Sequence, residues 1–163
     1  MIYDWVGGKP VISSAEYEWS GGAPYVIIDV TGGDPNLSND PTSYAFGVLA
    51  ASATASTGLN YFTITNSSGF AIDISISGTD MIGGVDWDLA DDGNPGADIY
   101  AMKAGLDGGS YNIIVRETAP FNTLKAGLAN GATQAWGMQL LAPTSFSDGV
   151  PKSGTITITG AAS

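Results

Sequence analysis

Cysteine and histidine are both absent from this chain of 163 residues. Without cysteine, the chain cannot form a disulfide framework, a thiolate metal site or a cysteine nucleophile. Without histidine, it lacks the commonest general base and the commonest ligand of transition metals. These absences exclude most hydrolase arrangements, although a pair of carboxylates could still support glycoside hydrolysis.

Positive charge is also scarce. The chain has 5 lysines and arginines against 16 acidic residues, for a net charge of −11. The cations are scattered along the chain, and such an arrangement cannot follow a phosphate backbone or an anionic membrane surface. We therefore expect neither nucleic acid nor membrane insertion. The acidity either keeps the protein soluble by mutual repulsion or serves cation binding and docking on a basic surface, and composition leaves both open.

Long apolar runs are missing as well, since no segment approaches the eighteen or more residues needed to span a membrane. The first residues, MIYDWVGGKP, have neither the basic start nor the apolar run of a signal peptide. Yet only 13% of the residues are charged, and abundant serine, threonine and glycine resemble the composition of proteins that live outside cells. A virion protein needs no leader because it is released by lysis. We therefore expect a virion surface location, with an extracellular or cell-surface location as the alternative.

What the chain does have is alternation, and it is clearest in residues 59–77, LNYFTIT–NSSG–FAIDISIS. Because successive side chains of a strand point to opposite faces, Phe62 and Ile64 share a face, and so do Phe70, Ile72, Ile74 and Ile76. The polar NSSG segment has the length and composition of a hairpin loop. This stretch predicts a β-hairpin with an apolar inner face and a Thr- and Ser-rich outer face.

Similar short alternating runs occur elsewhere along the chain, including Tyr25–Val30, Trp136–Leu140 and Thr155–Thr159. Turn signals recur every eight to twelve residues, which predicts an all-β, antiparallel sandwich of about nine to eleven short strands. At most one short helix is expected, near residues 120–129, where Leu124 and Leu128 have helical spacing. The loop-like segment before Tyr44 suggests an N-terminal arm or extra strands over residues 1–43 and the sandwich over 44–163, together one compact unit.

Three segments carry a resemblance to a known class of modules: FTITNSSGFAIDISISG, ANGATQAWGMQLLAP and DGVPKSGTITITG. Their order resembles Ig-like modules of microbial surface proteins and of tailed-phage structural proteins, such as decoration, tail and fibre components. The resemblance covers about residues 44–163. It implies an Ig-like β-sandwich with a non-catalytic role, and it carries over no active-site residues.

The densest acidic cluster lies in DWDLADDGNPGAD, and its members are Asp86, Asp88, Asp91, Asp92 and Asp98. Ca²⁺ prefers six to eight oxygen ligands, which such a loop could supply, although the spacing does not match an EF-hand. The alternative is an acidic turn in which the carboxylates accept hydrogen bonds from nearby backbone. Ca²⁺ is the one cofactor that the sequence suggests.

The remaining candidates are aromatic, carboxylate and asparagine side chains. Trp87 and Trp136 alternate with polar residues and are expected in the core, whereas the expected interface residues are Trp5, Tyr17, Trp19, Tyr61 and Thr63. The carboxylates that could form a catalytic pair are Glu16, Glu18 and Glu117, but no apolar pocket is evident to raise one pKa. Asn36 and Asn66 begin glycosylation sequons.

These features predict a non-enzymatic structural protein of a tailed-phage virion, an outer-surface or decoration component that docks on copies of itself or on other structural subunits. One alternative is a secreted filament or surface-layer subunit in which residues 1–19 complete a neighbour's sheet by strand donation. The third is a carbohydrate-binding module that stacks sugars on exposed tryptophan.

Overall fold

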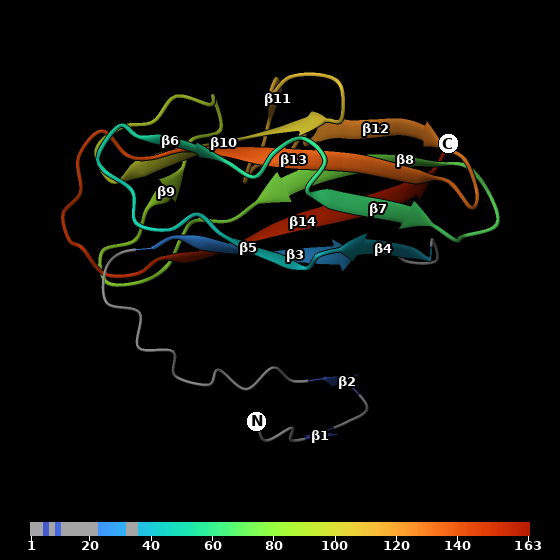
Figure 1. The fold of residues 1–163 in the computed structure, drawn as a ribbon, viewed down its shortest axis with the longest axis horizontal. Helices are drawn as coiled ribbons and strands as arrows, with labels where there is room; N and C mark the ends of the chain where they lie inside the picture. Colours follow the sequence, from blue (N-terminus) through green and yellow to red (C-terminus); the bar gives the residue numbers. More distant parts are fainter. Residues whose placement is uncertain (1–4, 7–8, 11–22, 32–35) are drawn as a thin grey trace.

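The computed structural model of the chain describes residues 5–6, 9–10, 23–31 and 36–163. Within these ranges the chain contains strands and no helix, and two large sheets pack face to face (Figure 1). The predicted all-β sandwich is therefore confirmed. Because the described residues include no helix, they include none long and apolar enough to cross a membrane.

The larger sheet has seven strands. Its main order is β11 (Ile113–Ile114), β10 (Ile99–Leu106), β13 (Thr133–Leu141), β7 (Phe62–Asn66) and β4 (Leu37–Asp40). Two short strands complete it: β6 (Thr54–Ser56) pairs with β13, and β9 (Asp88–Leu89) pairs in parallel with β10.

The smaller sheet has five strands in the order β12 (Asn122–Leu128), β8 (Ile72–Gly78), β14 (Ser153–Ala162), β3 (Tyr25–Thr31) and β5 (Ser43–Ala45). The pairing of β3 with β14 is parallel, from Tyr25 opposite Ser153 to Thr31 opposite Thr159. The sandwich is therefore not wholly antiparallel as predicted, and the described residues form 14 strands where nine to eleven were expected. Strands from Tyr25 onward thus belong to the two sheets, and the sequence boundary at residue 43 falls inside β5, within one sandwich. Separately, β1 (Trp5–Val6) pairs with β2 (Lys9–Pro10).

The core lies between the sheets and follows the predicted alternation. Phe62, Ile64, Ile72, Ile74 and Ile76 are fully buried, as the sequence pattern predicts. In the same interior the ring of Phe62 stacks on Trp136, with 4.8 Å between ring centroids. Burial of such side chains contributes roughly 1.5–3 kcal/mol each relative to leaving them exposed.

The predicted hairpin is wrong, although its two strands exist. β7 pairs with β4 and β13, whereas β8 pairs with β12 and β14 in the other sheet. The segment between them, residues 67–71, is therefore an arch from one sheet to the other (Figure 1). Alternation reports which face of a strand is apolar but not which strand is its neighbour, and two strands facing one core from opposite sides show the same pattern.

The arch also explains why Phe70 departs from its predicted face, since it lies in the turn and is 42% exposed. The side chain of Asn66 stabilises this turn through hydrogen bonds. Its side chain is buried, and its amide Nδ2 donates to the carbonyls of Phe70 and Leu128, both at 2.8 Å. Its Oδ1 accepts from the Ser68 backbone N–H at 3.0 Å.

The predicted short helix is also wrong, because Asn122–Leu128 forms strand β12. Leu124 and Leu128 are buried as the helical spacing suggests. A separation of four is even, however, so it also places two side chains on one face of a strand. β12 pairs with β8 through register shifts between Thr123 and Leu128, which is the irregular pairing of a bulged edge strand.

Candidate functional site

The acidic loop predicted for Ca²⁺ is tied to neighbouring loops by its own carboxylates. Asp91 Oδ1 accepts a hydrogen bond from the Glu117 N–H at 2.6 Å, and its Oδ2 accepts one from the Thr118 hydroxyl. The hydroxyl of Thr118 is the main reason that the pKa of Asp91 lies below its ordinary value. Asp98 repeats the arrangement, accepting from the Ser147 N–H at 2.7 Å and from its hydroxyl.

The other three acidic candidates, Asp86, Asp88 and Asp92, do not share the contacts of Asp91 and Asp98. Asp86 accepts from the Gly83 N–H at 3.2 Å. Asp92 accepts from the Asn94 N–H at 2.9 Å, and this bond lowers the pKa of the Asp92 carboxyl. Asp88 has an exposed side chain. Across the described ranges, no three acidic side chains come together in a way that could hold a metal ion. The contacts are those of acidic turns that bind backbone and hydroxyl groups.

Sequence reasoning missed a pair of residues beside this loop, Asp148 and Lys152. Lys152 is 1% exposed, and its ammonium lies 2.6 Å from Asp148 Oδ1 and donates to the Gly83 carbonyl. The same ammonium lies 5.8 Å from the ring centroid of buried Trp87. A lysine rarely enters a core without a partner. The sequence does show a possible ion-pair partner for Lys152, because Asp148 precedes it by four positions. This spacing alone does not predict that the lysine is buried.

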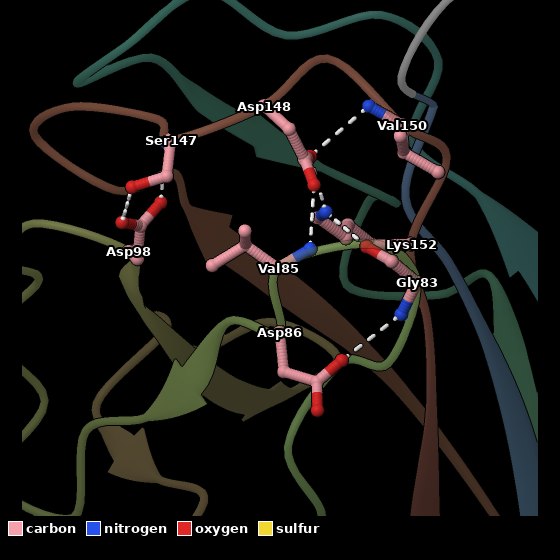
Figure 2. Close-up of polar contacts among 8 residues, drawn as sticks. All are labelled: Gly83, Val85, Asp86, Asp98, Ser147, Asp148, Val150 and Lys152. Atoms are coloured by element: carbon pink, nitrogen blue, oxygen red, sulfur yellow. Dashed lines mark hydrogen bonds and ion pairs between the residues drawn. The ribbon is translucent and has the colours of Figure 1, made fainter.

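Asp148 joins two loops that are distant in sequence, residues 81–87 and 146–152. Figure 2 shows its carboxylate accepting from the N–H groups of Val85 at 2.5 Å and Val150 at 3.1 Å, as well as from Lys152. The Lys152 hydrogen bond, followed by the Val85 hydrogen bond, lowers the pKa of Asp148 to about 2. These hydrogen bonds join the two loops, and we call the joined pair the loop clamp.

Glycine is required inside the loop clamp. Gly83 has φ of +141°, and a Cβ there would lie 2.2 Å from the Pro151 carbonyl oxygen. A Cβ and a carbonyl oxygen cannot approach this closely, and the oxygen belongs to the backbone, so it cannot rotate away as a side chain could. The Gly-Gly pair in MIGGVDW is therefore needed for the close approach of the two loops.

The loop clamp borders an exposed apolar surface on the smaller sheet. Ser153 of β14 pairs with Tyr25 of β3 on one side and bridges to Ile82 on the other. Registered neighbours in a sheet point to the same face, so these side chains share the outer face, and the next pair adds Ile27 beside Thr155. The exposed fractions are 62% for Ile82 and 47% for Ile27. We call this surface the apolar corner.

An open hollow of about 370 Å³ lies within the apolar corner. Aliphatic, hydroxyl and carboxylate side chains line it, namely Ile27, Ile82, Ser153, Thr155, Asp80 and Glu117. Of these, the sequence singled out Glu117 alone, as a member of a catalytic carboxylate pair. Its neighbour in the hollow is Asp80, and its other two suggested partners, Glu16 and Glu18, lie outside the described residues.

The remaining sequence candidates lie elsewhere. Tyr61 is 41% exposed, with its ring against Tyr44 and Phe62, and Thr63 is half-buried in β7. Trp87 and Trp136 are in the core, as predicted, so neither ring can stack on a sugar. Tyr17 and Trp19 lie outside the described residues, and for Trp5 only its backbone pairing in β1 is described.

The two sequons differ in accessibility. Asn66 is fully buried with both amide hydrogens bonded, whereas Asn36 is exposed. The folded chain can therefore present only Asn36 to a glycosylating enzyme.

Comparison with models of known protein families finds no match, and comparison with curated protein sequences finds none either.

Proposed function

We propose that the protein is a non-enzymatic structural subunit that docks on a neighbouring subunit of a larger particle through the apolar corner. The observation that carries the proposal is the combination of exposed Ile27 and Ile82 with the loop clamp beside them. Soluble proteins place single apolar side chains on the surface routinely, but a contiguous group held on a rigid support is typical of an interaction site.

The polar side chains of the loops support the same role. Asp91 and Asp98 each accept from a backbone N–H and a hydroxyl of a loop distant in sequence. Asp148 accepts from the Val85 N–H of a distant loop and from Lys152 of its own loop. Their contribution is therefore to keep the loops in place. A sandwich whose loops are joined in this way is suited to bear load and to present a fixed surface.

The particle that fits the sequence best is a tailed-phage virion, with the protein as an outer-surface or decoration component. Supporting this are the resemblance of residues 44–163 to Ig-like modules of such particles and the low-charge composition typical of proteins outside cells. The Ig-like modules of microbial surface proteins provide the alternative, a secreted filament or surface-layer subunit.

Strand pairing bears on how the alternative would assemble. β14 already lies between β8 and β3 of the same chain. A strand donated by a neighbour would therefore add at an edge of the sheet, such as β5 or β12, and not inside it. Residues 1–19 of a neighbour would therefore extend this sheet at an edge and would not fill a gap inside it.

Immunogold labelling of particles and fibres purified from the producing culture tests the proposal. Gold on the outer surface of tailed particles supports the virion role, gold along filaments supports the alternative, and label found only on free protein would refute both. A variant lacking residues 1–19 and the variant Ile82→Thr separate the two docking modes. Loss of particle labelling in Ile82→Thr alone supports the apolar corner, and loss in the deletion alone supports the arm.

A further inference from the structure

The residues that line the hollow of the apolar corner include two aliphatic ones, Ile27 and Ile82, and two acidic ones, Asp80 and Glu117. We propose that this hollow receives a lysine or arginine side chain from an apolar segment of a partner subunit. The inference rests on the proposed docking function and specifies the chemistry of the partner.

A basic side chain matches the hollow because it is itself amphipathic. Lysine and arginine lay an aliphatic stem along apolar surface while the charged head stays at a polar rim. Ile27 and Ile82 provide the surface for the stem, at 47% and 62% exposure. Burying the stem against them releases water from both, and the head then lies at the carboxylates.

Both carboxylates retain unused capacity. Asp80 Oδ1 accepts one hydrogen bond, from the Leu89 N–H at 2.7 Å. Arg116, the residue before Glu117, donates instead to the carbonyls of Asp91 and Pro120, at 3.1 and 3.2 Å. In the part of the chain that the structure describes, the one ion pair joins Lys152 to Asp148. Asp80 and Glu117 therefore present negative charge without a cation of their own.

The charge of the whole chain decides between a second copy and a different partner. Each copy carries a net charge of −11, so two copies repel one another at distances up to about 8–10 Å, the screening length near physiological salt. A partner with a basic segment is attracted instead, and its association is accelerated. The occupant is therefore a segment of a different subunit, with a basic residue between apolar ones.

The hollow is organised before anything binds. Thr79 and Thr155 are joined by two hydrogen bonds of 3.1 Å, one of them through the Thr79 hydroxyl. The hydroxyl of buried Tyr100 donates to the Thr79 carbonyl at 2.5 Å, and the loop clamp fixes the backbone next to Ile82. A preorganised site loses little conformational entropy on binding.

The test measures binding of two peptides to the full chain with isotope-labelled isoleucine methyl groups. The probe is acetyl-Leu-Arg-Leu-amide, and its neutral match is acetyl-Leu-citrulline-Leu-amide. We expect the arginine peptide to shift the methyl resonances of Ile27 and Ile82 and to bind about three- to tenfold more tightly, the range for one or two exposed ion pairs. Raising the salt concentration should remove most of that difference.

Two charge-matched variants locate the effect. Asp80→Asn with Glu117→Gln should bind both peptides equally, since amides keep the shape and the acceptor but lose the charge. Asp40→Asn with Asp107→Asn removes the same charge from the other sheet, where both side chains are exposed, and should retain the preference. The double variant Ile27→Thr with Ile82→Thr should bind both peptides more weakly. Its melting temperature should stay within a few degrees of that of the wild type.

Equal binding of the two peptides to the wild-type chain would overturn the inference, as would a preference that survives loss of Asp80 and Glu117 charge. These outcomes are distinguishable from failure of the proposed function. A chain that labels particles but binds neither peptide docks by other chemistry, whereas a chain that prefers the arginine peptide but labels no particle is a binding module outside an assembly.

Discussion

Replacing Asn66 with alanine removes four hydrogen bonds from the arch between β7 and β8. Two of them are donated by Nδ2 to the carbonyls of Phe70 and Leu128, and two are accepted by Oδ1 from the backbone and hydroxyl of Ser68. The Phe70 carbonyl keeps a second partner, the Ser68 hydroxyl at 3.1 Å. The bond to the Leu128 carbonyl is buried, so that oxygen is left without its amide partner.

The expected loss of stability follows from these groups. A buried acceptor left without a partner costs about 1–3 kcal/mol, and each remaining neutral hydrogen bond contributes about 1 kcal/mol net. Asn66→Ala should therefore lower the free energy of unfolding by about 4–6 kcal/mol, out of the roughly 5–15 kcal/mol of a typical domain. For a domain of this size, the corresponding fall in melting temperature is about 8–24 °C.

Asn66→Asp sharpens the experiment because it keeps the shape but loses both donated bonds. Desolvation and the two carbonyl oxygens should raise the folded-state pKa of the new carboxyl above its unfolded value of about 3.9. Between the unfolded and the folded pKa of this carboxyl, the folded state binds more protons than the unfolded state. The free energy of unfolding of the variant therefore falls as the pH rises through the folded pKa. The deficit of Asn66→Asp should be larger at pH 7 than near pH 4, whereas that of Asn66→Ala should stay constant.

Urea denaturation followed by circular dichroism measures both variants, with exposed Asn60→Ala as the control. The control should stay within about 0.5 kcal/mol of the wild type. If Asn66→Ala also falls within that range, the hydrogen bonds of Asn66 do not hold the arch, and the reasoning is wrong. A pH-independent deficit in Asn66→Asp would show that the side chain is solvated.

Three further predictions concern the loops near the apolar corner. Gly83→Ala should cost at least about 3 kcal/mol from clash and backbone strain, whereas Gly149→Ala, with no atom within 4 Å of the added Cβ, should change the urea midpoint little; equal effects would contradict the close approach inside the loop clamp. The pKa of Asp148 is lowered from 3.8 to about 2, so its stabilisation is complete above the unfolded pKa and is lost as the pH falls through this window. Calorimetry should therefore show a smaller acid-induced fall in melting temperature for Lys152→Met than for the wild type, and an equal fall would argue against the ion pair. Millimolar Ca²⁺ should leave the melting temperature unchanged, because the acidic-loop carboxylates already bind loop donors; a rise in melting temperature would contradict that assignment.

Much of the core could be predicted from the sequence because strand alternation is a local property. Ile72, Ile74 and Ile76 repeat every second position, and a strand with that pattern has one apolar face whatever it pairs with. Trp87 and Trp136 were placed in the core by the same reasoning, and both are buried. The acidic loop was recognised as well, with its two interpretations, because closely spaced aspartates restrict the options to turn contacts or a cation.

The errors share a cause, which is that local spacing does not identify a neighbour. Leu124 and Leu128 fit one face of a helix and one face of a strand, and pairing with β8 selects the strand. The apolar corner was invisible for the same reason. Tyr25 and Ile82 share a face because both pair with Ser153, a residue far from either in sequence.

The sequence by itself determined that this chain is a β-sandwich, which of its strand faces are apolar and which chemistries its side chains cannot perform. These follow from residue type and from a period of two, which each segment shows without reference to any other. The tertiary structure decided that residues 67–71 form an arch and that Lys152 is buried. The ammonium of Lys152 and the Gly83 carbonyl that it binds are 69 positions apart, and only the packing of two sheets brings such distant groups together.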